Sequence, residues 1–152
     1  MSKKILKVIM SIFFGTLGIT MIFSKIFHSQ QKKESDQLDI EDEGHVKFNI
    51  LLGGGAKYIT TQKFEQANLK CRFGGMEVYF DNASLCEGKG IIKIDASFSG
   101  VELYMPKDWT VVNDLRVGMG AVEFKNGAQP DPDKIVTLVG NVSLGAVEIH
   151  YV

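Results

Sequence analysis

Residue types that usually mark a catalytic or metal-binding protein are scarce in this sequence of 152 residues. The 2 cysteines are too few for a disulfide-stapled fold, and no Cys/His spacing of a zinc site is present. None of the 3 histidines, His28, His45 and His150, has a nucleophile or ligand partner nearby in the sequence. We therefore expect a protein that is not an enzyme, with no catalytic residue, no cofactor-binding residue and no metal ligand.

An excess of charge of one sign is also lacking. Because 17 Lys+Arg balance 18 Asp+Glu, the net charge of −1 supplies no general field that would attract nucleic acid, and we expect no nucleic-acid partner. With 3 prolines and 16 glycines the chain is neither collagen-like nor of low complexity. Its length allows one modest domain with appendages.

One long apolar run is present near the start. Residues 8–24 follow Lys3, Lys4 and Lys7 and contain no charged side chain. As a helix they would span about 26 Å, close to the thickness of a hydrocarbon core. The run predicts a single-pass membrane anchor over residues 1–27; a cleaved signal peptide is the alternative, although no A-x-A-like site follows. Lysines flank the run on both sides, which leaves the orientation in the cell membrane open.

A polar segment follows the apolar run. Residues 28–45 change from basic to acidic and contain too little apolar surface to offset the entropy of ordering, so they predict a flexible linker. The remaining residues, 46–152, are expected to form the folded domain.

The domain contains five copies of a pattern represented by Phe-Gly-Gly-Met-Glu-Val-Tyr at residues 73–79. The copies start at Leu52, Phe73, Phe98, Met119 and Leu144, which are separated by 21, 25, 21 and 25 residues. Repeats of this length indicate stacked units that cannot bury an apolar face alone. Apolar residues recur with period two on both sides of a glycine-rich corner, which predicts two short strands per copy.

The period predicts an all-β domain, namely a short β-solenoid of about five rungs in which each copy stacks on the preceding one. Like residues would then lie in columns facing one interior. We expect the corner residues Phe73, Phe98, Met119 and Leu144 to share that interior, and Cys71 to be buried in a neighbouring column. An antiparallel β-sandwich built from the same strands is the alternative.

Alternate positions of the second strand in each copy are acidic or aromatic and are expected to face outward. This stripe is either a solvated surface or a face that binds a basic partner segment or a cation. The candidate interaction residues are Glu77, Tyr79, Glu102, Tyr104, Glu123 and Glu148.

The last copy is followed by almost no further sequence. Stacked repeats need caps, and an uncovered final strand is a template for pairing with another chain. We therefore expect an edge contact at Ile149 and Tyr151, either with a partner protein or with a second copy.

Three blocks of the domain also resemble a known family. FGGMEVYFDNASL, IIKIDASFSGVELYMPKDWTV and GMGAVEF are similar to the C-terminal domain of LiaF-like proteins, cell wall-active antibiotic response proteins of Gram-positive bacteria. The resemblance covers approximately residues 48–152. It implies a membrane-tethered regulator close to a sensor histidine kinase in a two-component system for envelope stress.

These observations lead to two hypotheses about function. The first is a membrane-anchored, non-enzymatic regulator of the cell-envelope stress response that acts by protein–protein contact with a sensor kinase system. The second is a self-associating, membrane-tethered β-solenoid scaffold.

Overall fold

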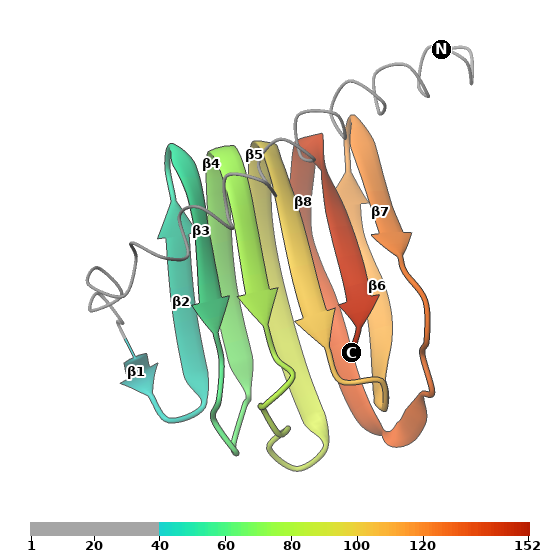
Figure 1. Cartoon of the computed structure of the whole chain (residues 1–152). Coiled ribbons are helices and arrows are strands. Elements are labelled where there is room, and N and C mark those ends of the chain that lie inside the picture. Colours follow the sequence, from blue (N-terminus) through green and yellow to red (C-terminus); the bar gives the residue numbers. More distant parts are fainter. Residues whose placement is uncertain (1–39) are drawn as a thin grey trace. The chain divides into compact units, whose positions relative to one another are not determined.

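The computed structural model describes residues 40–152, which form strands joined by turns and short loops (Figure 1). This described part contains no helix that is long and apolar enough to cross a membrane. The predicted anchor over residues 1–27 lies outside it, as does most of the predicted linker. The strands are β1 (Ile40–Asp42), β2 (His45–Ile50), β3 (Gly53–Tyr58), β4 (Gln66–Tyr79), β5 (Lys89–Met105), β6 (Trp109–Val117), β7 (Gly120–Phe124) and β8 (Asp131–Tyr151). Because β1 and the first residue of β2 precede residue 46, the fold begins earlier than the predicted domain boundary.

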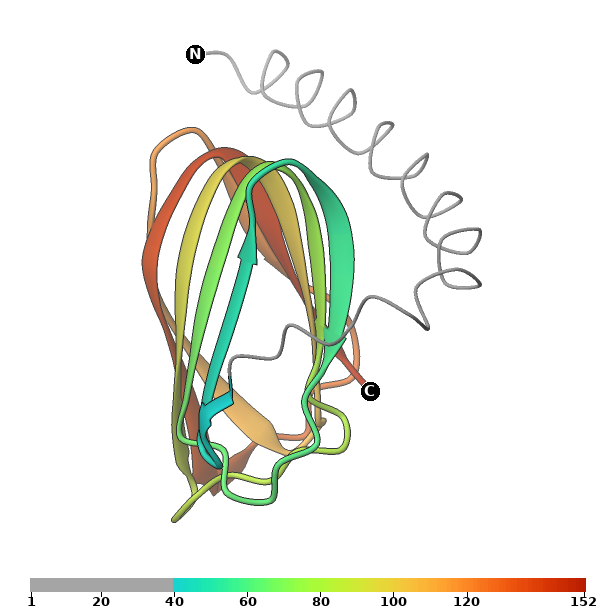
Figure 2. The ribbon, with the colours of Figure 1, turned by 90° about the vertical axis from the view of Figure 1, so that its left-hand side faces the viewer.

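The strands wind into a parallel β-solenoid of about 4 turns. Each long strand, β4, β5 and β8, runs along one side of the stack, bends at a corner and returns along the other side (Figure 2). In the two outer layers the same path is divided between two consecutive strands, β2 then β3 in one layer and β6 then β7 in the other. We call the outgoing half of each layer the first side and the returning half the second side. All pairs of named strands are parallel except β1 with β2, so the solenoid is confirmed and the antiparallel sandwich is excluded.

Columns of like residues form the core, as the repeat predicted. On the first side, Leu69 of β4 pairs with Ile94 of β5. On the second side, Val78, Leu103 and Ile149 follow one another in adjacent layers, and each is 0% exposed. Complete burial of a side chain of this size stabilises a fold by about 1.5–3 kcal/mol relative to leaving it in water.

The order of the layers differs from the order of the copies along the chain. β8 carries the fifth copy, yet it lies between β5 and the layer of β6 and β7. The expectation that each copy stacks on the preceding one is therefore wrong for the fourth copy, because the fifth copy is inserted between it and the third. The inward position that Leu138 fills in β8 is filled by Asn113 in β6. An apolar strand gains most from neighbours on both sides, whereas a strand with an inward amide is better placed at an end of the stack.

This order also removes the uncovered final strand that the sequence suggested. β8 is paired along both of its edges, and Ile149 lies between Leu103 and Phe124. Ile149 is fully buried, while Tyr151 is half-buried and pairs with Met105. The premise of the expected edge contact at Ile149 and Tyr151, an uncovered last strand, is therefore wrong, because among the described residues the open edge at this end of the stack belongs to β6 and β7 (Figure 1).

The corner residues point away from the core rather than into it. Phe73, Phe98 and Leu144 have positive φ angles of 55°, 51° and 54°, in the left-handed region. Phe73 is 56% exposed and Phe98 is 49% exposed, so the prediction that the corner residues share the interior is wrong. Cys71 and Met76 both point inward although an odd number of positions separates them, so strict alternation cannot hold between them. The corner residue absorbs the extra position by turning outward.

An aromatic cluster closes the core along the margin of the layers that lies opposite the corners. Trp109, at the start of β6, is 3% exposed. Its ring lies 6.1 Å from the ring of Phe64 and 5.8 Å from that of Phe80, measured between centroids. These contacts join the loop after β3, the end of β4 and the start of β6, and they hold the layers together along this margin.

Candidate functional site

The residues predicted as an interaction face lie together on the outer surface of the second side. Equivalent positions in β4, β5, β8 and β7 form a row of four carboxylates: Glu77, Glu102, Glu148 and Glu123. Two residues further along each strand, a second row consists of Tyr58, Tyr79, Tyr104, His150 and Lys125. We call these two rows the acid–aromatic face. The sequence repeat is sufficient to place all six predicted residues on this face.

The rings of the second row are stacked from layer to layer. The centroid distances are 4.5 Å for Tyr58 and Tyr79, 4.4 Å for Tyr79 and Tyr104, and 4.7 Å for Tyr104 and His150. The corresponding interplanar angles are 10°, 9° and 12°. Aromatic pairs on adjacent strands stabilise a sheet, and a slip of one residue would break the whole row. The row therefore fixes the register of the second side.

Three of the four carboxylates of the face, Glu77, Glu102 and Glu123, accept hydrogen bonds from the second row. The hydroxyl of Tyr79 donates to Glu77 Oε2 at 2.8 Å, and that of Tyr104 donates to Glu102 Oε2 at 2.7 Å. Nε2 of His150 lies 3.2 Å from Oε2 of Glu148 and 3.8 Å from Oε2 of Glu102. In the end layer, Lys125 Nζ donates to Glu123 Oε2. These partners offset the repulsion that stacked carboxylates would otherwise cause.

Burial controls protonation in the middle of the face. Glu102 is 6% exposed, and burial raises the pKa of its carboxyl group, an effect that the hydrogen bond from Tyr104 partly opposes. Burial is also the main reason why the pKa values of Tyr79 and Tyr104 are raised, and their hydrogen bonds to Glu77 and Glu102 raise them further. Both phenols therefore stay protonated at neutral pH and act as hydrogen-bond donors.

Internal contacts satisfy most of the polar groups of the acid–aromatic face. Its carboxylates stand in a row instead of converging on one point. Within residues 40–152, no group of three or more His, Cys, Asp or Glu side chains is placed to hold a metal ion. Binding of a basic partner or a cation to this face remains a prediction.

A second surface, which the sequence had assigned to the core, runs along the corners. One apolar residue from each layer contributes to it, and we call this surface the corner ridge. Phe73 and Phe98 lie side by side on it, with ring centroids 5.2 Å apart and planes at 7°. In layer order the ridge consists of Leu52, Phe73, Phe98, Leu144 and Met119. Leu52 is 82% exposed and Met119 is 52% exposed, so the ridge presents a continuous apolar surface to solvent. The odd spacing between inward residues on the two sides of the corner is the sequence signal that could have revealed it.

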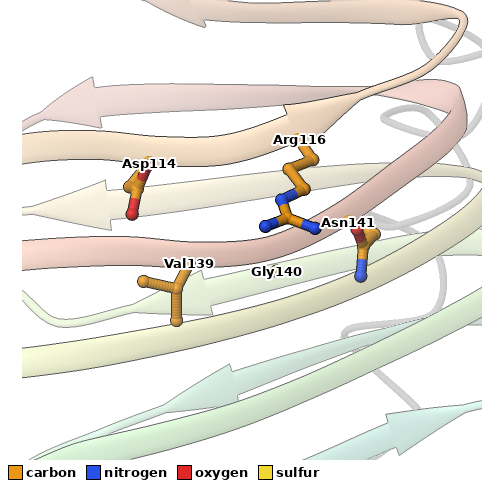
Figure 3. A pocket seen from close by; sticks show the side chains of 5 residues that line it. All are labelled: Asp114, Arg116, Val139, Gly140 and Asn141. Carbon is orange, nitrogen blue, oxygen red and sulfur yellow. The ribbon is translucent and has the colours of Figure 1, made fainter.

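The outer surface of the first side is mostly basic and adjoins the ridge. Its exposed cations include Lys47, Lys70, Arg72, Lys93 and Arg116. A shallow pocket opens on this surface between β6 and β8 (Figure 3). Its lining consists of Asp114, Arg116, Val139, Gly140 and Asn141, and both of its charged residues belong to the end strand β6.

Comparisons of the chain with protein-family models, with curated proteins and with solved structures found no match.

Proposed function

We propose that this protein is a membrane-anchored, non-enzymatic regulator of a cell-envelope stress response, and that it acts by contact with a sensor kinase system. The corner ridge is the observation that carries the proposal. Phe73, Phe98 and Met119 are each about half exposed, and their side chains form an apolar surface outside the core. A contiguous apolar surface on a folded domain marks a site for another protein or a membrane.

The construction of the ridge supports its role as a docking surface. Phe73 and Phe98 have φ angles of 55° and 51°, and left-handed backbone costs a bulky residue about 1–2 kcal/mol. Such conformations persist only where the surrounding structure enforces them, and they cluster at functional positions. The stacked strands on either side hold the ridge rigid, so little side-chain entropy would be lost on binding. The resemblance to LiaF-like domains supplies the class of partner.

The proposal is tested in the native bacterium with a transcriptional reporter of the envelope-stress response. Deletion of the gene is expected to change basal or antibiotic-induced output. The double variant Phe73→Asn/Phe98→Asn is expected to reproduce the deletion, because asparagine tolerates the left-handed region while the apolar surface is lost. The matched control is Ile91→Asn, which removes a 46% exposed side chain from the first side of β5 and should behave as wild type.

Two outcomes would contradict the proposal at different levels. Unchanged reporter output after deletion would exclude the regulatory function itself. A normal response from the double variant, at wild-type abundance, would exclude the ridge as the contact surface while leaving the function standing.

The side of the membrane on which the domain lies is open to a separate measurement. Cys86 is partly exposed, whereas Cys71 is fully buried, so labelling with a membrane-impermeant maleimide should report on Cys86 alone. Labelling in intact cells would place the domain outside, and labelling only after lysis would place it in the cytoplasm, where a kinase domain is within reach.

A further inference from the structure

The two ends of the stack are covered very differently. At the first end, β1 pairs with β2, and Lys57 occupies an inward position in β3. The Nζ atom of Lys57 lies 5.6 Å from the centre of the Phe48 ring and donates to the carbonyl of Lys47 at 3.1 Å. An inward charge and an extra strand are devices that keep an edge from pairing with another chain.

The opposite end, formed by β6 and β7, lacks this cover within the described residues. Both strands pair only with β8 there. Val117 and Phe124 lie in inward columns, yet they are 37% and 46% exposed. The core is therefore open at this end, and completing it would bury apolar surface.

Within residues 40–152, β6 has no strand partner along one of its edges, so backbone groups along that edge can pair with an incoming strand. The amide of Gly118 donates to the carbonyl of Val142 in β8, so the even-numbered residues of β6 point their polar backbone groups towards β8. The odd-numbered residues point theirs outward. Consistent with this, the amide of Leu115 is bonded to the side-chain oxygen of Asn113 at 3.2 Å rather than to a neighbouring strand. A bond to a local side chain is readily exchanged for one to an incoming carbonyl.

Charge along this edge is self-complementary. Asp114 and Arg116 flank Leu115 and lie on the same outer surface, where both are exposed (Figure 3). If β6 pairs antiparallel with a second β6 about Leu115, Asp114 lies opposite the partner's Arg116, and Arg116 lies opposite the partner's Asp114. Centring the pair on Asp114 or Arg116 would instead place like charges opposite each other. β7 repeats the pattern with Glu123, Phe124 and Lys125.

We propose that the edge formed by β6 and β7 binds a second copy of this chain, through an antiparallel β6–β6 pair with a two-fold axis at Leu115. Because the backbone groups of odd-numbered residues point to the free edge, Leu115 can exchange two backbone hydrogen bonds with the Leu115 of the second copy, as in a hydrogen-bonded antiparallel pair. The contact is isologous and stops at a dimer. A head-to-tail filament would need the other end to accept a strand, and Lys57 and β1 oppose that. The dimer leaves the corner ridge as a separate surface.

The test uses the full-length protein in detergent, with mass measured by size-exclusion chromatography and light scattering. The wild type is expected to be a dimer. Asp114→Arg and Arg116→Asp should each raise the dimer dissociation constant about 10-fold or more, because two opposite-charge pairs become like-charge pairs. The double variant Asp114→Arg/Arg116→Asp should restore the dimer. Lys93→Glu, an exposed charge reversal two strands from the edge, is the matched control and should remain dimeric.

Circular dichroism of each variant establishes that it is folded, and the double variant guards against a fold defect at either position. A monomeric wild type, open-ended oligomers, a dimer unaffected by the single reversals, or a folded double variant that stays monomeric would each overturn the proposal.

Discussion

The middle and the outer layers of the solenoid are built from copies of one sequence pattern, yet they differ in burial. In one inward column, Leu103 and Ile149 of the middle layers are fully buried, while the equivalent Phe124 of the outer layer is 46% exposed. The difference comes from the neighbours, because a middle layer is covered on two faces and an outer layer on one. In a stack, position decides how much each copy contributes to stability.

The corners of the middle and outer layers also differ, in which residue adopts a positive φ angle. The middle layers turn through the bulky residues Phe73, Phe98 and Leu144 with positive φ. The outer layers place positive φ at Gly53 and Gly120, where a glycine carries no such penalty. Strain is tolerated where neighbours on both sides enforce it and is avoided at the ends.

The largest effect is expected from removing the fifth copy. A chain ending at residue 129 lacks β8, and the strands β6 and β7 then lose the only strand with which they pair in the described structure. We expect the truncated protein to lose its cooperative unfolding transition, measured by circular dichroism in urea. Had the copies stacked in chain order, the same truncation would have removed only an end layer, and a folded four-layer protein would contradict the observed order.

A smaller effect is expected from single core residues, with a clear difference between layers. Leu103→Ala should lower the free energy of unfolding by about 2–5 kcal/mol, because the cavity is enclosed on all sides. Phe124→Ala, in the same column but half exposed, should cost about 1 kcal/mol despite the larger truncation. Urea unfolding of both variants measures the comparison, and equal losses would refute it.

Removing the hydrogen bond to the buried carboxylate of Glu102 should lower the free energy of unfolding by less than truncating a core side chain. Tyr104→Phe keeps the ring in its stack but removes the donor to Glu102, so we expect a loss of about 1.5–3 kcal/mol. Tyr79→Phe removes the same bond to Glu77, which is only half-buried, and should cost less. If the two variants lose equal stability in urea, burial does not set the strength of these bonds.

The smallest effect should appear only as a dependence on pH. Because burial raises the folded-state pKa of Glu102, protonation of this group favours folding. That contribution is fully present below the unfolded pKa near 4.5 and is lost as pH rises through the folded value.

Glu102→Gln is neutral at every pH, so its stability relative to wild type should increase as the pH rises from about 4.5 towards neutrality. Unfolding curves collected across this range test the expectation. A flat difference for Glu102→Gln would contradict the prediction.

Much of the fold could be predicted because overlaying the copies of the repeat gives the register in which neighbouring strands pair. Pairs such as Leu69 with Ile94, and Glu77 with Glu102, follow directly from overlaying the copies. The acid–aromatic face could be predicted for the same reason. The hydrogen bonds that occupy it could not, because they depend on how the Tyr79 and Tyr104 side chains turn within the stack.

Period and column identity were properties of the sequence alone: a residue pattern repeated at fixed spacing has to place like side chains in line once the copies stack. The order of the copies and the outward turn of the corners were decided only in three dimensions. Several orders satisfy the same pattern, and the observed one places the wholly apolar inward face of β8 between two neighbours while leaving Asn113 of β6 at an end. Phe73 turns outward because the inward residues of both sides are an odd number of positions apart. They can face one core only if one residue at the bend breaks the alternation of side chains.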